Sequence, residues 1–101
     1  MKTLPWKELS KEDKILLKDL YLNGADCAKF ISRRFNWELG ATMERLKRLE
    51  KLGFLKRVSG RFAVIRGKFK HMNHTYYELT RPAKLYLRKH PEELEGLSVK
   101  D

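Results

Sequence analysis

The chain has 101 residues, of which 42% are hydrophobic, so it is long enough for one small domain and too apolar for wholesale disorder. Lysine and arginine total 23 against 13 acidic residues, and this formal charge of +10 favours a polyanionic partner, most simply nucleic acid. The alternative interpretation is a basic, solvated surface that binds no polyanion. No apolar run approaches the roughly 20 residues of a membrane span. The lone Cys27 allows no internal disulfide and no signal-peptide pattern is seen, so a cytoplasmic protein is expected.

The first half of the chain predicts a short lead-in followed by three helices. Residues 1–9 form the lead-in, which Trp6 would anchor on the core. Ser10 followed by Asp13 is a capping-box pattern that starts the first helix, and the Asn-Gly pair at 23–24 ends it. The apolar residues between these points recur at helical spacing, so one face of this helix is expected to be buried.

The second and third helices are separated by a tight turn. Asp26 is the expected N-cap of the second helix, and residues 35–37 interrupt the pattern where an asparagine tolerates a left-handed turn. The third helix is expected over about 38–52 and ends before Gly53, a residue suited to positive φ. Its expected core face consists of Leu39, Thr42, Leu46 and Leu49. Its outward face consists of Gly40, Ala41, Glu44 and Lys47, with Arg45 and Arg48 on the flanks.

A basic β-wing is expected after Gly53, over about 54–79. Residues 54–58 and 61–65 have the pattern of a strand and a returning strand around a Ser-Gly turn. Residues 67–74 are polar and basic with turn residues, and 75–79 alternate as a further strand.

A last helix and a tail complete the chain. Thr80 caps a helix expected over about 81–90, with Pro82 in its first turn, and an acidic tail follows over 91–101. The order of elements predicts an α+β, mainly helical fold over residues 10–90. This fold is a winged helix-turn-helix with a three-helix core, a basic β-wing and a C-terminal helix.

Two phrases resemble the winged-helix superfamily of the MarR-like and ArsR-like type. They are residues 44–55 (ERLKRLEKLGFL) and residues 76–81 (YYELTR). In that superfamily the first phrase is the recognition helix running into the wing, and the second is the strand returning from the wing into the next helix. The resemblance implies the fold more than a function, because the same fold also serves in protein docking. Residues 73–77 also resemble small archaeal winged-helix proteins of uncharacterised function.

The positive charge concentrates in the wing, where no acid occurs between Lys56 and His74. Such a ribbon can lie along a sugar-phosphate backbone while the third helix enters the major groove. The third helix is close to neutral, and Glu44 near its centre would repel phosphates, so the wing is expected to carry more of the binding. The residues expected to bind DNA are Arg45, Lys47, Arg48, Lys56, Arg57, Arg61, Arg66, Lys68 and Lys70.

The sequence therefore predicts a DNA-binding transcriptional regulator that acts on double-stranded DNA. A homodimer is a further expectation, paired through the first helix with Trp6 or through the last helix with Tyr86 and Leu87. Two alternatives remain open. A protein-docking module of the transcription machinery would use exposed aromatic side chains such as Trp37. An RNA-binding protein would use the wing on a structured or single-stranded target.

No arrangement of residues typical of an enzyme is found. The sequence contains no phosphate-binding loop, nucleophile elbow or HExxH motif. His71 and His74 are too few for a metal site, so neither a metal nor another cofactor is expected. Cys27 is expected as a buried apolar side chain at the start of the second helix. No small-molecule effector is expected, because so short a chain has no separate sensor domain and its sequence shows no pocket.

Overall fold

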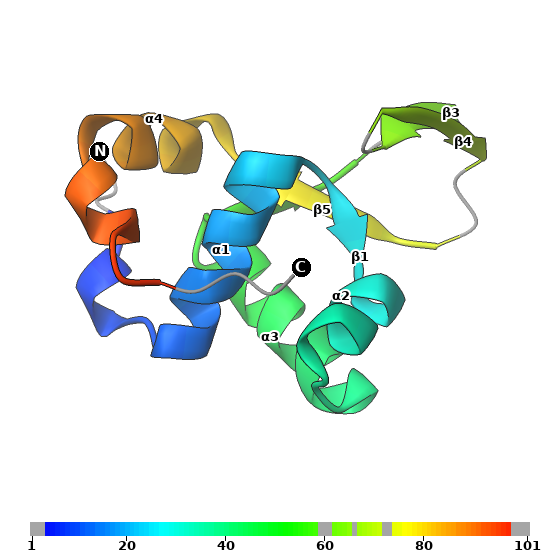
Figure 1. Cartoon of the computed structure of the whole chain (residues 1–101), viewed down its shortest axis with the longest axis horizontal. Helices are drawn as coiled ribbons and strands as arrows, with labels where there is room; N and C mark the ends of the chain where they lie inside the picture. The colour runs from blue at the N-terminus through cyan, green and yellow to red at the C-terminus, as the bar shows by residue number, and fades with distance from the viewer. Residues whose placement is uncertain (1–3, 59–61, 66, 72–73, 98–101) are drawn as a thin grey trace.

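The computed structural model describes residues 4–58, 62–65, 67–71 and 74–97. In chain order its elements are η1 (Trp6–Glu8), α1 (Lys11–Asn23), β1 (Asp26–Cys27), α2 (Ala28–Phe35), α3 (Leu39–Lys51), β2 (Leu55–Arg57), β3 (Phe62–Ile65), β4 (Lys68–His71), β5 (Tyr76–Leu79), α4 (Arg81–Lys89) and η2 (Pro91–Leu94). The helices form the body of the molecule, and the β3–β4 hairpin projects from it (Figure 1). The expected winged helix-turn-helix fold is confirmed.

Several of the helix ends lie where local signals in the sequence place them. Ser10 and Asp13 form a complete capping box at α1, with each side chain accepting a hydrogen bond from the backbone amide of the other. Asn36 follows α2 with φ of 57°, the left-handed conformation that asparagine tolerates. Gly53 follows α3 with φ of 95°, which favours glycine. Thr80 caps α4 through its hydroxyl group.

Asp26 is not the N-cap of α2, and that prediction is wrong. It lies in β1, which pairs with β5, and Cys27 occupies the N-cap position without a capping side-chain bond. The pairing of β1 with β5 requires an extended backbone one residue before the helix. The carboxylate of Asp26 accepts a hydrogen bond from Arg34 at 2.9 Å and so fastens β1 to α2.

The wing is built from different strand pairs than the sequence pattern indicates. The main sheet has the order β1-β5-β2, with Leu55 opposite Leu79 and Arg57 opposite Tyr77. A direct pairing of residues 54–58 with 61–65 is therefore wrong, because β3 pairs with β4 in a separate hairpin. The polar segment 67–74 contributes a strand to that hairpin, and the expected turn at residues 59–60 lies outside the described residues.

The core lies where the four helices and the main sheet meet. Thr42, Leu46 and Leu49 of α3 are buried there, as expected. Leu39 is 47% exposed, so its assignment to the core is wrong; it lies in the first turn of α3 and faces the hollow described below. The largest fully buried apolar side chains are Trp6, Phe54, Leu16, Leu17, Ile31, Leu46, Leu49, Leu55, Leu79 and Leu87.

The residues expected to form a dimer contact belong to this core instead. Trp6 and Leu87 are buried, and the ring of Trp6 lies 5.8 Å from that of the half-buried Tyr86. Amphipathic spacing cannot distinguish an apolar face that packs within a chain from one that packs between chains, and here the lead-in packs against α4. The buried side chains of Trp6 and Leu87 are therefore not available as a dimer surface, whereas Tyr86 stays half-buried.

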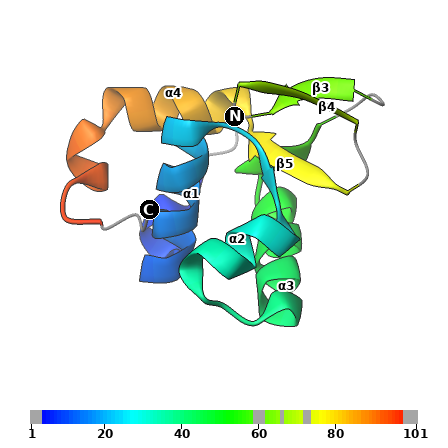
Figure 2. The same cartoon turned by 45° about the vertical axis from the view of Figure 1, so that its right-hand side comes forward.

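The segment after α4 turns back beside α1 (Figure 2). Glu93 accepts a hydrogen bond from the Trp6 indole nitrogen at 2.7 Å. Lys18 of α1 donates to the backbone carbonyls of Leu94 and Leu97 at 3.0 Å and 2.7 Å. The first part of the acidic tail is thereby packed on the helical body.

Candidate nucleic-acid interface

The outer face of α3 is as the sequence predicts. Gly40, Ala41, Glu44 and Lys47 are all exposed. An open groove of about 710 Å³ runs along this face, and we call it the α3 groove. Its lining residues are Ala41, Glu44, Arg45, Lys47, Arg48 and Lys51. The structure thus brings the three expected DNA-binding residues of this helix onto one surface.

Arg45 and Arg48 are both bound to one buried carboxylate. Asp13 is 1% exposed, and it accepts hydrogen bonds from Arg45 Nη1 at 2.5 Å and from Arg48 Nη2 at 2.6 Å. The Arg45 side chain is 23% exposed and that of Arg48 is 54% exposed. Arg45 therefore serves mainly to join α3 to α1, whereas Arg48 keeps much of its surface open to a ligand.

Trp37 does not form the exposed aromatic patch expected for a protein-docking surface, and that prediction is wrong. Its half-buried ring stacks on Phe35 with the ring centres 4.8 Å apart. The guanidinium carbon of Arg45 lies 5.1 Å from the centre of the Trp37 ring. The exposed large apolar side chains in this region are Leu39 and Met43.

Arg34 of α2 is an internal ion-pair partner. Its guanidinium donates to the buried carboxylates of Asp19 and Asp26. Burial lowers the pKa of Arg34, but the hydrogen bonds and negative charges of the two acids outweigh this effect and raise it above its ordinary value. Arg34 thus joins α1, β1 and α2, while Lys29 and Arg33 are the exposed cations of this helix.

The root of the wing presents two of the expected cations to solvent. Lys56 and Arg57 in β2 are both exposed. The Nε atom of Arg57 lies 3.4 Å from a carboxylate oxygen of Glu50. Because the side chains of this pair are 58% and 33% exposed, the pair is weak and leaves Arg57 open to an anion.

The tip of the wing is the β3–β4 hairpin. Lys68 at the start of β4 is exposed. Lys70 lies in β4 opposite Ala63. Arg61 and Arg66 lie outside the described residues, so their expected role in binding remains a prediction.

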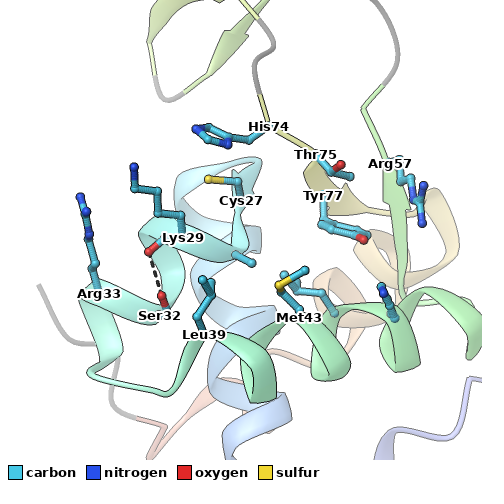
Figure 3. A pocket seen from close by; sticks show the side chains of 13 residues that line it. Cys27, Lys29, Ser32, Arg33, Leu39, Met43, Arg57, His74, Thr75 and Tyr77 are labelled. Carbon is cyan, nitrogen blue, oxygen red and sulfur yellow. Dashed lines mark hydrogen bonds between the residues drawn. The ribbon is translucent and has the colours of Figure 1, made fainter.

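A hollow of about 600 Å³ lies between α2, α3 and the root of the wing (Figure 3). Buried Cys27, Leu46 and Tyr77 line its floor, and the exposed side chains of Leu39 and Met43 line one wall. Its remaining lining residues are Ala28, Lys29, Ser32, Arg33, Lys47, Arg57, His74 and Thr75. Sequence reasoning did not find this hollow, because its residues come from five separate elements and the loop before β5.

The hollow and the α3 groove share Lys47 and form one continuous surface. Glu44 is the acid among the described residues that line the two. The cations that line them are Lys29, Arg33, Arg45, Lys47, Arg48, Lys51 and Arg57. Cations gathered in a concave surface raise the local concentration of a polyanion and speed its association.

Other kinds of site have little support in the described part of the chain. No group of three or more His, Cys, Asp or Glu side chains there could hold a metal ion. The helices in the same ranges are all too short or too polar to cross a membrane. His74 is exposed, and its ring lies 6.4 Å from that of Phe30 in an edge-on arrangement.

A family profile described as "Uncharacterized protein conserved in archaea (DUF2250)" matches residues 7–90. The match covers nearly all of the helical body and the wing. No curated protein sequence matches the chain.

Several solved structures are similar to this chain in fold. A MarR family regulator from Neisseria meningitidis has a TM-score of 0.64 at 17% identity. The match covers 89% of this chain and 58% of the chain of that regulator. A variant of ZitR from Lactococcus lactis has a TM-score of 0.68 at 16% identity, with coverage of 88% and 55%. The adhesin competence repressor from Streptococcus pyogenes has a TM-score of 0.61 at 21% identity, with coverage of 85% and 57%. The MarR-like winged helix is thus confirmed as a fold, and the chain spans less than two thirds of each of these proteins.

Proposed function

We propose that this chain, which belongs to the family described as uncharacterised proteins conserved in archaea, is a DNA-binding protein that regulates transcription. The observation that carries the proposal is the continuous cationic surface joined at Lys47. It combines the outer face of α3 with the root of the wing, the two parts of a winged helix that contact duplex DNA. The protein acts by binding and has no catalytic role.

The two parts of the surface have different roles in this proposal. The exposed face of α3 has small residues at Gly40 and Ala41, so its backbone can come close to base edges in the major groove. The cations of the wing contact phosphates, which position the protein without reading sequence. Arg48 contributes a phosphate contact when it leaves Asp13, and Lys56, Arg57 and the cations of the wing tip supply the rest.

A homodimer remains part of the proposal. Winged helices commonly bind two half-sites about one helical turn apart, and a dimer supplies the second reading helix. The exposed large apolar side chains outside the cationic surface are Leu22 of α1, Leu52 after α3 and Leu85 of α4, among the described residues. Sedimentation of wild type beside Leu85→Gln and Leu22→Gln would show whether α4 or α1 holds two copies together.

A salt titration with duplex DNA of arbitrary sequence tests the proposal. If each subunit contacts about 4–6 phosphates, the logarithm of the binding constant should fall against the logarithm of salt with a slope of about −4 to −5. Binding that barely changes between ~50 and ~300 mM salt would contradict phosphate contact. Stronger competition by structured RNA at the same salt would favour RNA as the ligand instead.

A matched pair of double variants locates the contact. Lys56→Ala with Lys68→Ala removes two exposed wing cations, whereas Arg81→Ala with Lys84→Ala removes two exposed cations from α4. The wing variant should reduce the steepness of the salt dependence by about 2 and weaken all sequences alike. The α4 variant has the same net charge and should retain the wild-type slope. Equal losses in both variants would show that net charge, not the wing, drives binding.

A further inference from the structure

The exposed side of α4 is a cationic surface that the proposed DNA contact does not use. Four exposed cations lie there around Leu85, which is 40% exposed, at spacings of three and four residues. We call these five residues, Arg81, Lys84, Leu85, Arg88 and Lys89, the α4 face. None of them lines the α3 groove or the hollow. In Figure 1, α4 and the β3–β4 hairpin lie toward opposite ends of the molecule.

The charges of the α4 face are not balanced within the described part of the chain. None of its four cations takes part in an ion pair there. No acid occurs in the sequence over residues 79–91. The next two acids have other partners, since Glu92 lies 3.2 Å from His90 Nδ1 and Glu93 accepts a hydrogen bond from the Trp6 indole. The α4 face can therefore pair with carboxylates from another molecule.

Helix stability accounts for only half of this charge. Arg88 and Lys89 lie in the last turn of α4, where the helix dipole favours cations. Arg81 and Lys84 lie in its first turn, where the dipole disfavours cations, and no acid in that turn offsets them. Stabilisation of the helix therefore does not explain these two residues, whereas binding of an acidic partner does.

We propose that the α4 face binds an acidic segment of another protein, in which carboxylates surround one apolar side chain. The carboxylates pair with the four cations while the apolar side chain covers Leu85. The phosphates of a nucleic acid would leave Leu85 without an apolar partner. A lipid surface would require a larger exposed apolar area, since the other large apolar side chains of α4 are buried or half-buried.

A second copy of this chain does not fit the same face. Two-fold pairing brings one surface against itself, so two α4 faces would meet cation against cation. An acidic segment binds without that repulsion. The inference goes beyond the proposed function and does not depend on it, because the α4 face shares no residue with the surface proposed for DNA.

The probe is a labelled synthetic helical peptide with four glutamates around one leucine, and its control has glutamines in place of the glutamates. In fluorescence anisotropy at ~150 mM salt, the acidic peptide should bind at least about tenfold more tightly than the neutral one. Arg81→Gln with Lys84→Gln should weaken the acidic peptide about tenfold and fold at least as stably as wild type, because both cations oppose the helix dipole. Lys56→Gln with Lys68→Gln removes the same charge from the wing and should leave the peptide affinity unchanged.

A second matched pair tests the apolar centre of the face. Leu85→Gln should weaken the acidic peptide but not a version with serine in place of the leucine, whereas Leu22→Gln on α1 should weaken neither.

Four results would overturn the proposal. They are equal binding of the acidic and neutral peptides, equal losses in the α4 and wing variants, displacement of the peptide by duplex DNA, and tighter binding to phosphatidylserine vesicles than to the peptide. A dimer that Leu85→Gln dissociates in sedimentation would assign the face to a second copy and so also overturn it. Peptide binding by a protein that binds no duplex would support this inference while refuting the proposed function.

Discussion

Replacing Asp13 by asparagine should lower stability and raise DNA affinity at the same time. The carboxylate is 1% exposed and binds Arg45 and Arg48, so its loss leaves two guanidinium groups without their counter-charge. Removing one partner of a fully buried pair costs about 3–5 kcal/mol. Arg45 is 23% exposed and Arg48 is 54% exposed, and an exposed pair contributes only about 0–1 kcal/mol. We therefore expect the free energy of unfolding to fall by about 2–3 kcal/mol.

The same substitution releases Arg48 into the α3 groove. A freed arginine on the proposed DNA surface adds about one phosphate contact, which should steepen the salt slope by about 0.9. The affinity for duplex DNA at low salt should then rise several-fold. The capping box is largely retained, because the asparagine side-chain oxygen can still accept from the amide of Ser10.

Glu12→Gln is the matched control for Asp13→Asn. Glu12 is exposed in the same first turn of α1, and its substitution changes the net charge by the same amount. It should cost no more than about 1 kcal/mol through the helix dipole and leave the salt slope unchanged. Urea denaturation followed by tryptophan fluorescence gives the stability, and duplex titrations at several salt concentrations give the slope. The reasoning is refuted if Asp13→Asn is as stable as Glu12→Gln, or if it binds DNA more weakly.

Substitutions at three further positions test local features of the fold and the site. Burial and the charge of Glu93 raise the pKa of Tyr86 above its ordinary value of 10.0. The neutral phenol therefore contributes stability that is present below about pH 10 and is lost as the pH rises through the folded-state pKa. Tyr86→Phe should lessen this loss of stability at alkaline pH in denaturation curves. Asn36 has φ of 57°, so Asn36→Ala should cost about 1 kcal/mol in thermal unfolding while Asn36→Gly stays close to wild type. Glu38→Gln weakens the cap of α3 and removes a negative charge from the N-terminus of that helix, so duplex affinity at low salt should rise although the helix loses about 0.5–1 kcal/mol. An unchanged alkaline loss, an Asn36→Ala variant as stable as wild type, or a Glu38→Gln variant that binds DNA more weakly would each contradict its prediction.

The helices could be predicted because their signals are local. The capping box at Ser10, the left-handed Asn36 and the glycine after α3 each act within a few residues of the helix end. The strand pairing could not be predicted in the same way, because β2 pairs with β5 across the whole intervening hairpin. The alternation of residues 61–65 predicts a strand, which the structure shows at Phe62–Ile65, but it contains no information on the partner of that strand.

The charge that the α3 surface presents was harder to predict, because it depends on side chains that are distant in sequence and pair with the arginines of α3. Helical spacing predicts Arg45 and Arg48 on the flanks of α3, and both line the α3 groove. Asp13 lies 32 residues before Arg45, and no pattern in the sequence indicates that it is buried beneath both arginines. The hollow could not be predicted for the same reason. Leu39 is apolar and lies at the spacing of a core residue, yet it lines a cavity at the surface. Burial of a residue at the end of a helix depends on what packs beyond that end.

Two carboxylates determine how α3 can take part in binding. Glu38 accepts hydrogen bonds from the amides of Gly40 at 2.7 Å and Ala41 at 3.2 Å, and so occupies the helix N-terminus where a phosphate would otherwise bind. A Cβ atom at Gly40 would lie 2.7 Å from Glu38 Oε1, so the glycine allows this close approach. Asp13 offsets one of the two positive charges of Arg45 and Arg48 on the same helix from below. With both groups in place, α3 attracts phosphates weakly, and the steering charge must come from the wing and the mouth of the hollow. The cations of the wing would then determine the affinity for DNA. The α3 helix would discriminate between bases through its shape and through short contacts.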